Sequence, residues 1–244
     1  MGADQQIDWN ATAASALDWW HDAGVDVLVD DAPRDWFAAP APVAAAAPPV
    51  SATPAVPTPP AMPTSLADFL EWRVGDAAPE AGWRGTSILA SGAADAAIMV
   101  LVDCPDRDDE TDGILMSGQT GRLFDRMLAA IGLDRASIHL AAVCARRPVA
   151  GRTPGEVETQ LAQIARHHVA LVAPKRLLLL GNAASRALLG AESTQIRGRL
   201  HGLNHKGGQT EAVASFHPRF LIEKPAAKAE AWKDLQMLIG GMTT

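Results

Sequence analysis

Apolar runs of five or six residues alternate with longer amphipathic stretches from about residue 96 to the end of the chain. The short runs predict buried strands, and apolar positions recurring every three or four residues predict helices. In the stretch 121–132, for example, the apolar side chains fall on one helical face and Gly132 ends the helix. The predicted strands are 97–102, 137–143, 176–181 and 212–216, and the predicted helices are 121–132, 154–174, 182–190 and 226–241.

The predicted strands are apolar on both faces, which is typical of a parallel sheet covered by helices on both sides. We therefore expect a three-layer α/β/α fold with a central parallel sheet. In such sheets the ligand binds at the carboxyl ends of the strands. That rule directs attention to the loops 103–113, 144–154 and 217–225. A basic, glycine-rich stretch, 197–208, is a candidate hairpin that could contact DNA or form a turn.

An Ala/Pro-rich segment divides the chain. Residues 38–64 are nearly uncharged and rich in proline, so they predict an extended linker between an N-terminal segment, 1–37, and a main domain, 65–244. Ser65, three residues before Asp68, predicts a helix N-cap at the start of that domain. The acidic segment 1–37 holds Trp19, Trp20 and Trp36. It either folds back onto the main domain or binds a protein partner through its aromatic side chains, and we prefer the second interpretation.

Composition limits the class of protein. The chain has 244 residues, 48% of them hydrophobic, which is enough for one sizeable core. Its longest apolar run, 96–102, is far shorter than the ~18 residues of a spanning helix, and no basic-then-apolar leader opens the chain. We expect a soluble, cytoplasmic protein with no membrane partner. The two cysteines, Cys104 and Cys144, are too few for a disulfide framework and lack metal-ligand spacing, so buried thiols are expected.

Charge is distributed unevenly along the chain. Residues 1–116 hold 4 Lys and Arg against 19 Asp and Glu, whereas residues 117–244 hold 17 against 9. A basic half suggests a nucleic acid or another polyanion as its partner, although surface charge often serves solvation alone.

Five short motifs add to this picture. They are VDCPD (102–106), GILMSGQTGRL (113–123), RPVAGRTP (147–154), LGNAA (180–184) and HPRFL (217–221). In order and spacing they resemble the motifs of the uracil-DNA glycosylase superfamily, most closely its family-four iron-sulfur type. The resemblance covers about residues 90–240.

This resemblance implies a DNA glycosylase of base-excision repair, which hydrolyses the N-glycosidic bond of a flipped uracil or related damaged base in single- or double-stranded DNA. It makes His217 the hydrogen-bond donor to the leaving base, and Asp103, where the family has Glu, the residue that positions the attacking water. The alternative for His217 is a His-Pro turn with its ring bonded to the backbone, and for Asp103 a solvated acidic loop shared with Asp106, Asp108, Asp109 and Glu110.

The resemblance also implies the DNA contacts. Leu221 would be the wedge that fills the gap left by the flipped nucleotide, with Pro218, Arg219 and Phe220 beside it. Arg146 and Arg147 follow a predicted strand end, where they either contact phosphate or are solvated loop arginines. His167 and His168 lack acidic or cysteine partners at metal-ligand spacing, so packing and surface roles are expected.

Several positions depart from the family pattern. The base pocket, expected at Cys104, Pro105, Met116 and Ala142, has Met116 for the stacking Phe and Ala142 for the Asn that reads uracil, so it should discriminate bases poorly. Val102 and Asp106 replace glycines. Arg146 and Leu161 stand at two of the iron-sulfur cysteine positions, so no metal and no cofactor is expected.

A second hypothesis is therefore a catalytically degenerate relative that binds DNA or a repair protein. A generic nucleotide-binding module is disfavoured, because no Gly-rich phosphate loop follows the first strand.

Overall fold

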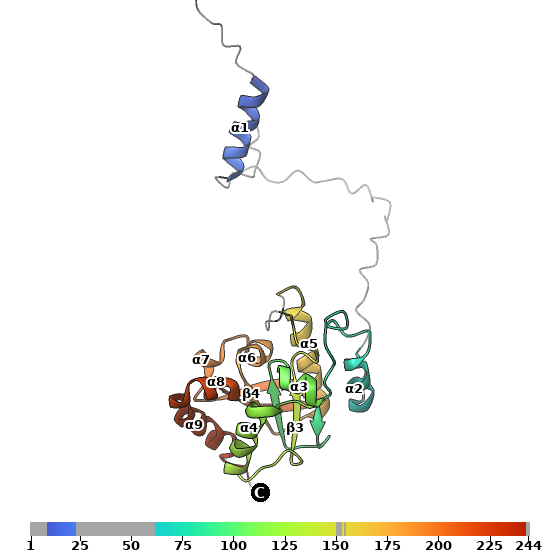
Figure 1. The fold of residues 1–244 in the computed structure, drawn as a ribbon, viewed down its shortest axis with the longest axis vertical. Coiled ribbons are helices and arrows are strands. Elements are labelled where there is room, and N and C mark those ends of the chain that lie inside the picture. The colour runs from blue at the N-terminus through green and yellow to red at the C-terminus, as the bar shows by residue number, and fades with distance from the viewer. Residues whose placement is uncertain (1–8, 23–61, 150–152, 154, 243–244) are drawn as a thin grey trace, which may run out of the picture. The chain divides into compact units, whose positions relative to one another are not determined.

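The structure is a computed structural model that describes residues 9–22, 62–149, 153 and 155–242 (Figure 1). The chain divides into two units, Met1–Val56 and Pro57–Thr244. In the first unit, the helix α1 (Trp9–Asp22) carries the exposed side chains of Leu17, Trp19 and Trp20. The predicted linker lies almost entirely outside the described residues, and so does Trp36.

The described residues of the second unit form a sheet of six strands in the order β1-β3-β2-β4-β6-β5. The four central strands, β3, β2, β4 and β6, are parallel, and β1 and β5 pair antiparallel at the two edges. The bounds are β1 (Ser91–Gly92), β2 (Ile98–Val102), β3 (Ile138–Ala142), β4 (Arg176–Leu180), β5 (Leu200–His205) and β6 (Gly208–Ser215). The predicted parallel sheet is confirmed, with antiparallel strands added at both edges.

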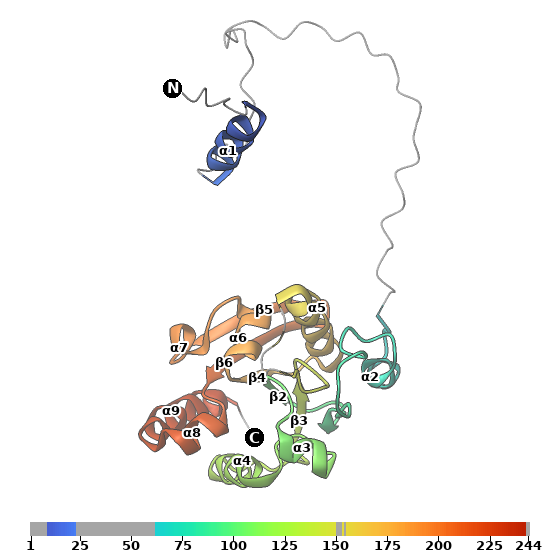
Figure 2. The same ribbon diagram turned by 45° about the horizontal axis from the view of Figure 1, so that its top comes forward.

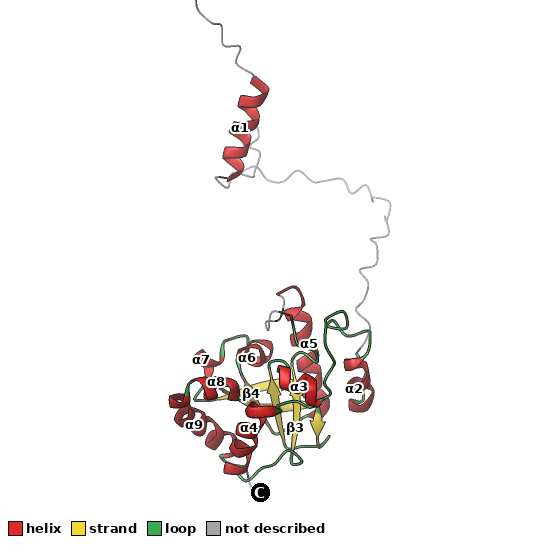
Figure 3. Ribbon diagram, viewed as in Figure 1, coloured by secondary structure: helices red, strands yellow, loops and turns green. Residues whose placement is uncertain are grey.

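Helices cover both faces of this sheet, as Figures 2 and 3 show. On one face Met99 and Leu101 of β2 pack in a core with residues of α2, α5 and α6, and on the other face Val100 and Val102 pack with residues of α4 and α9. The alternation follows from strand geometry, because successive side chains point to opposite faces. The bounds are α2 (Leu66–Val74), α3 (Arg107–Asp112), α4 (Gly118–Ala130), α5 (Gly155–Val172), α6 (Asn182–Leu189), α7 (Ser193–Ile196), α8 (Pro218–Glu223) and α9 (Lys228–Ile239). The three-layer α/β/α prediction is confirmed.

The long predicted elements are present, with ends shifted by a few residues. The hairpin predicted at 197–208 is present but extends further: its strands are β5 and β6, so that stretch includes β5, the turn and only the first residue of β6. The hydroxyl of Ser65 caps α2 by accepting a hydrogen bond from the Asp68 amide at 3.2 Å, as predicted. The one-turn helices α3, α7 and α8 were not predicted. No helix in the described part of the chain is long and apolar enough to cross a membrane.

Candidate active site

Two cavities lie at the carboxyl edge of the sheet, where the ligand was expected. Asp103, Asn182 and Arg219 line both of them. The smaller cavity, of about 250 Å³, also has His217 and Phe220 in its wall. The larger, of about 390 Å³, also includes Cys104, Arg186 and Glu192. Asp103 follows β2, Asn182 opens α6 after β4, and His217 follows β6, so three neighbouring strand ends build the site.

Asp103 is largely buried against the start of α6. Its Oδ1 accepts a hydrogen bond from the Ala184 amide at 2.8 Å. Gly181, with a φ of 106°, makes room for the carboxylate, because a Cβ at this position would collide with it. Burial raises the pKa of Asp103 to about 6, although the Ala184 hydrogen bond and the charge of Arg219 oppose the rise. The carboxyl group is therefore mostly ionised at neutral pH, as a group that positions and deprotonates water needs to be.

His217 is buried at the N-cap of α8. Its Nδ1 accepts a hydrogen bond from the Arg219 amide at 3.2 Å, which leaves the ring proton on Nε2. Burial, together with the nearby Arg219 charge, lowers the pKa of His217 to about 3. The ring is thus a neutral imidazole whose Nε2–H can donate. The alternative for His217 was a ring bonded to the backbone, and Nδ1 does make that contact. The same hydrogen bond orients the ring and leaves Nε2–H available to donate.

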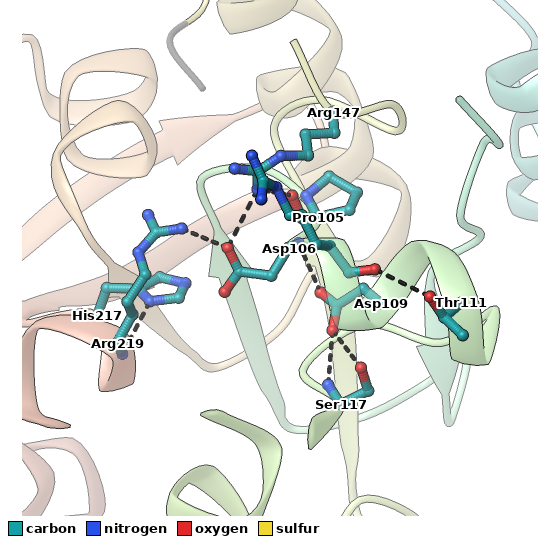
Figure 4. A network of polar contacts seen from close by, with 9 residues as sticks. Pro105, Asp106, Asp109, Thr111, Ser117, Arg147, His217 and Arg219 are labelled. Atoms are coloured by element: carbon teal, nitrogen blue, oxygen red, sulfur yellow. Dashed lines mark hydrogen bonds and ion pairs between the residues drawn. The ribbon is translucent and has the colours of Figure 1, made fainter. Parts of the chain in front are cut away.

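Asp106 bridges two arginines at this edge (Figure 4). Its Oδ1 lies 3.2 Å from Nη1 of Arg147 and also pairs with Nη1 of Arg219. Arg147 donates to the Pro105 carbonyl at 3.0 Å as well. The loops after β2 and β3 and the first turn of α8 are therefore tied together by one carboxylate.

The solvated acidic loop, which was the alternative considered for Asp103, does not describe Asp106 and Asp109. Asp109 is buried, and its Oδ1 accepts hydrogen bonds from the amide and hydroxyl of Ser117 at 2.6 and 2.8 Å. Its Oδ2 accepts from the Asp106 amide at 3.0 Å. The sequence held a signal for this arrangement, because acidic residues three positions apart are the spacing of a capping box at a helix start.

The predicted base pocket is only partly brought together. Cys104 lines the larger cavity, and burial raises the pKa of its thiol to about 11, so it is not a nucleophile. Of the residues that the structure describes, Met116 and Ala142 line neither of the two cavities and pack instead in the core with α4. Pro105 is buried too. Met116 has a φ of 54°, and its carbonyl accepts a hydrogen bond from the Arg135 guanidinium.

Leu221, the predicted wedge, is buried in the described structure, and its wedge role stays a prediction. Its side chain is 1% exposed and lies among residues of α4 and α9, so it is part of the core. Phe220, one position earlier, is partly exposed in the wall of the smaller cavity, and its ring centroid lies 4.8 Å from that of Phe216. Pro218 is buried in the first turn of α8, where its fixed φ suits a helix start.

Arg146 and Arg147 differ in what they contact. The Arg146 guanidinium donates to the Ser87 hydroxyl at 2.6 Å, to the Trp83 carbonyl at 3.2 Å and to the carbonyl of Ala81. These contacts hold the loop before β1 and favour a structural role, while its predicted phosphate contact stays a prediction. Arg147 lies beside the site.

The residues at the former cluster positions do not fit an iron-sulfur cluster. Such clusters are held by four thiolates, whereas the sequence has two cysteines, both buried in the described structure. Arg146 is occupied with loop carbonyls, and Leu161 is fully buried in the core under α5.

Asn182 was not singled out from the sequence, although it lines both cavities. Its Oδ1 accepts hydrogen bonds from the Ser193 amide at 3.1 Å and from the Ser193 hydroxyl at 2.7 Å. A signal was available in its position, because Asn182 directly follows Gly181 at the carboxyl end of a central strand.

Comparison with known proteins adds a second line of information. The family model described as the uracil DNA glycosylase superfamily matches residues 89–236. A type-4 uracil-DNA glycosylase from Pyrobaculum aerophilum is 26% identical over 174 residues, which cover 68% of this chain and 88% of that protein. Type-4 uracil-DNA glycosylases from Archaeoglobus fulgidus and Sulfurisphaera tokodaii are 26% and 22% identical, each over 151 residues, which cover 59% of this chain and 75% and 69% of the relatives. Asp103 and His217 both fall within the matched range.

Proposed function

The chain belongs to the uracil-DNA glycosylase superfamily, and on this basis we propose that it is a DNA glycosylase of base-excision repair. Its substrate is DNA, and it hydrolyses the N-glycosidic bond of a flipped uracil or a related damaged base. One observation carries the proposal. A partly buried carboxylate, Asp103, and a neutral imidazole donor, His217, line the same cavity at the carboxyl edge of the sheet.

The two side chains have complementary roles in this reaction. With the nucleotide extruded from the stack, the Asp103 carboxylate orients a water molecule and accepts its proton as the water oxygen attacks the sugar carbon. The bond between that carbon and the base nitrogen breaks, and its electrons leave with the base. The Nε2–H of His217 donates to a base carbonyl as this negative charge develops. A ring that is already neutral stays a hydrogen-bond donor throughout.

The surrounding residues complete the proposal. Arg219 and Phe220 lie at the mouth of the site and contact DNA, and Phe220, which is more exposed than Leu221, is the side chain that we propose enters the duplex. Met116 and Ala142 pack in the core and supply no amide to the base edge, whereas the amide of Asn182 lines both cavities. The weak discrimination between bases that the sequence predicted stays a prediction. We keep a cytoplasmic location as part of the proposal. The domain limits at 38–64 and a protein partner for residues 1–37 stay predictions.

Incubation with uracil-containing single- and double-stranded oligonucleotides, followed by alkali, tests the function. We expect strand breaks at uracil, and a rate at least ~100-fold lower for His217→Ala, as for loss of a donor aimed at developing charge. Asp103→Asn should be similarly impaired, and Asn204→Ala on β5 serves as the folded control. DNA binding without any excision by the wild-type protein would contradict the proposal and favour a DNA-binding relative that cuts nothing.

A further inference from the structure

A third cavity lies beside the active site and is rich in arginine. It has a volume of about 400 Å³, and its wall includes Arg84, Arg107, Arg147 and Glu110. The arginines come from three separate segments: the loop before β1, the first turn of α3 and the loop after β3. We call these three residues and the space between them the arginine cavity. Arg84 and Arg107 have no role in the fold or in the reaction described above.

Nearby carboxylates are directed away from this cavity or packed at its wall. Asp109 is buried against Ser117, and the carboxylate of Asp108 lies against the backbone of Gly118. Glu110 packs against the backbone of Gly85, where a Cβ would collide with its Oε1. Asp106 and Asp109 are thus bonded within the protein, whereas Asp108 is exposed and Glu110 lies in the cavity wall, so the repulsion on a polyanion is reduced.

Two of the three guanidinium groups are available to a ligand. Arg84 and Arg107 are exposed, and among the described residues neither forms an ion pair with a carboxylate. Three guanidinium groups and one carboxylate leave the wall of the cavity positively charged. Planar guanidinium groups match the geometry of phosphate oxygens, so a phosphate is the ligand that this wall fits.

The arginine cavity is linked to the active site through one carboxylate. Arg147 contacts Asp106, and Asp106 pairs with Arg219 (Figure 4). Arg219 in turn lines both cavities beside Asp103. We propose that Arg84, Arg107 and Arg147 bind backbone phosphates of the DNA strand beside the flipped nucleotide. This inference rests on the proposed function, since it takes DNA as the ligand.

The salt dependence of DNA binding tests the site. Binding of the full-length protein to a uracil-containing duplex is measured over a KCl series for wild type, Arg84→Gln, Arg107→Gln and the double variant. Each lost phosphate contact should reduce the slope of log K against log salt by about one and weaken binding roughly three- to tenfold at 0.1 M salt. Lys175→Gln removes one exposed charge before β4, at the opposite edge of the sheet, and should change neither quantity.

The arms of the experiment separate the possible failures. Uracil excision is followed on the same duplex at saturating protein, where the arginine variants should keep the wild-type rate because they act on binding. A wild-type protein that excises no uracil contradicts the proposed function, whereas a double variant with unchanged slope and affinity overturns the phosphate site. Inorganic phosphate is added at constant ionic strength as a third arm. Displacement of DNA from wild type, but not from the double variant, would support the assignment, because free phosphate would then compete with backbone phosphates for the same guanidinium groups. Equal displacement from both proteins would count against it.

Discussion

Burial has opposite effects on the two residues of the proposed reaction. Removing Asp103 from water raises the pKa of its carboxyl group, and removing His217 from water lowers the pKa of its ring. Both shifts favour the neutral form of the side chain. The Ala184 amide and the charge of Arg219 nevertheless limit the pKa of Asp103 to about 6, so the carboxyl group is mostly ionised at neutral pH. The site therefore holds a charged base and an uncharged donor, and the charge costs stability.

Replacing Asp103 by Asn should make this cost measurable. The pKa of Asp103 rises from 3.8 to about 6 on folding, so its favourable contribution is complete below about pH 3.8 and is lost as the pH rises through 6. Asn stays neutral and its carbonyl can still accept the Ala184 hydrogen bond. Urea unfolding at pH 8 should show the variant about 1 to 3 kcal/mol more stable than wild type, and the gain should vanish near pH 4. Equal free energies of unfolding for wild type and Asp103→Asn at pH 8 would show that burying the ionised carboxylate does not destabilise the folded protein.

At the level of elements, the residues of the proposed site lie in short loops and helices, which the apolar periodicity of the sequence predicts poorly. The sheet and the long helices could be predicted because each repeats its apolar pattern over several residues, and the strand-end rule then located the site. Helices α3 and α8 are six residues each, too short for such a pattern. Their folding depends on contacts with distant segments, such as Asp109 with Ser117 and Asp106 with Arg219. For the same reason the sequence could name His217 and Asp103 but could not place Leu221 in the core.

The hydrogen bonds of Asp109 should be essential to the position of α3. Asp109→Ala removes the acceptor for the Ser117 amide, the Ser117 hydroxyl and the Asp106 amide, and leaves these donors in a buried place. We expect a loss of about 2 to 4 kcal/mol in the free energy of unfolding. Asp112, on the same helix, is exposed and serves as the control. Asp112→Ala should change the free energy of unfolding by less than about 0.5 kcal/mol. Denaturant unfolding of both variants makes the comparison, and equal effects would show that α3 is held by other contacts.

Over the whole molecule, the formal charge of −7 has one source. Residues 1–61 contain eight Asp and a single Arg, and the remaining residues contain equal numbers of acidic and basic side chains. A DNA-binding domain of zero formal charge must therefore rely on where its charges lie. The structure accomplishes this by bonding Asp106 and Asp109 within the protein while Arg84 and Arg107 are exposed.

The acidic N-terminal segment should consequently weaken DNA binding at a distance. A variant that begins at Met62 lacks all seven net negative charges and retains every residue of the proposed site. At about 0.01 M salt, where charges interact over ~30 Å, it should bind a duplex oligonucleotide several-fold more tightly than the full chain. Near 1 M salt the range falls to about 3 Å, so the two affinities should converge. A titration by fluorescence anisotropy at both salt concentrations measures the difference. Weaker binding by the shortened protein at low salt would mean that the segment attracts DNA through contacts of its own, and a difference that persists at high salt would exclude a purely electrostatic effect.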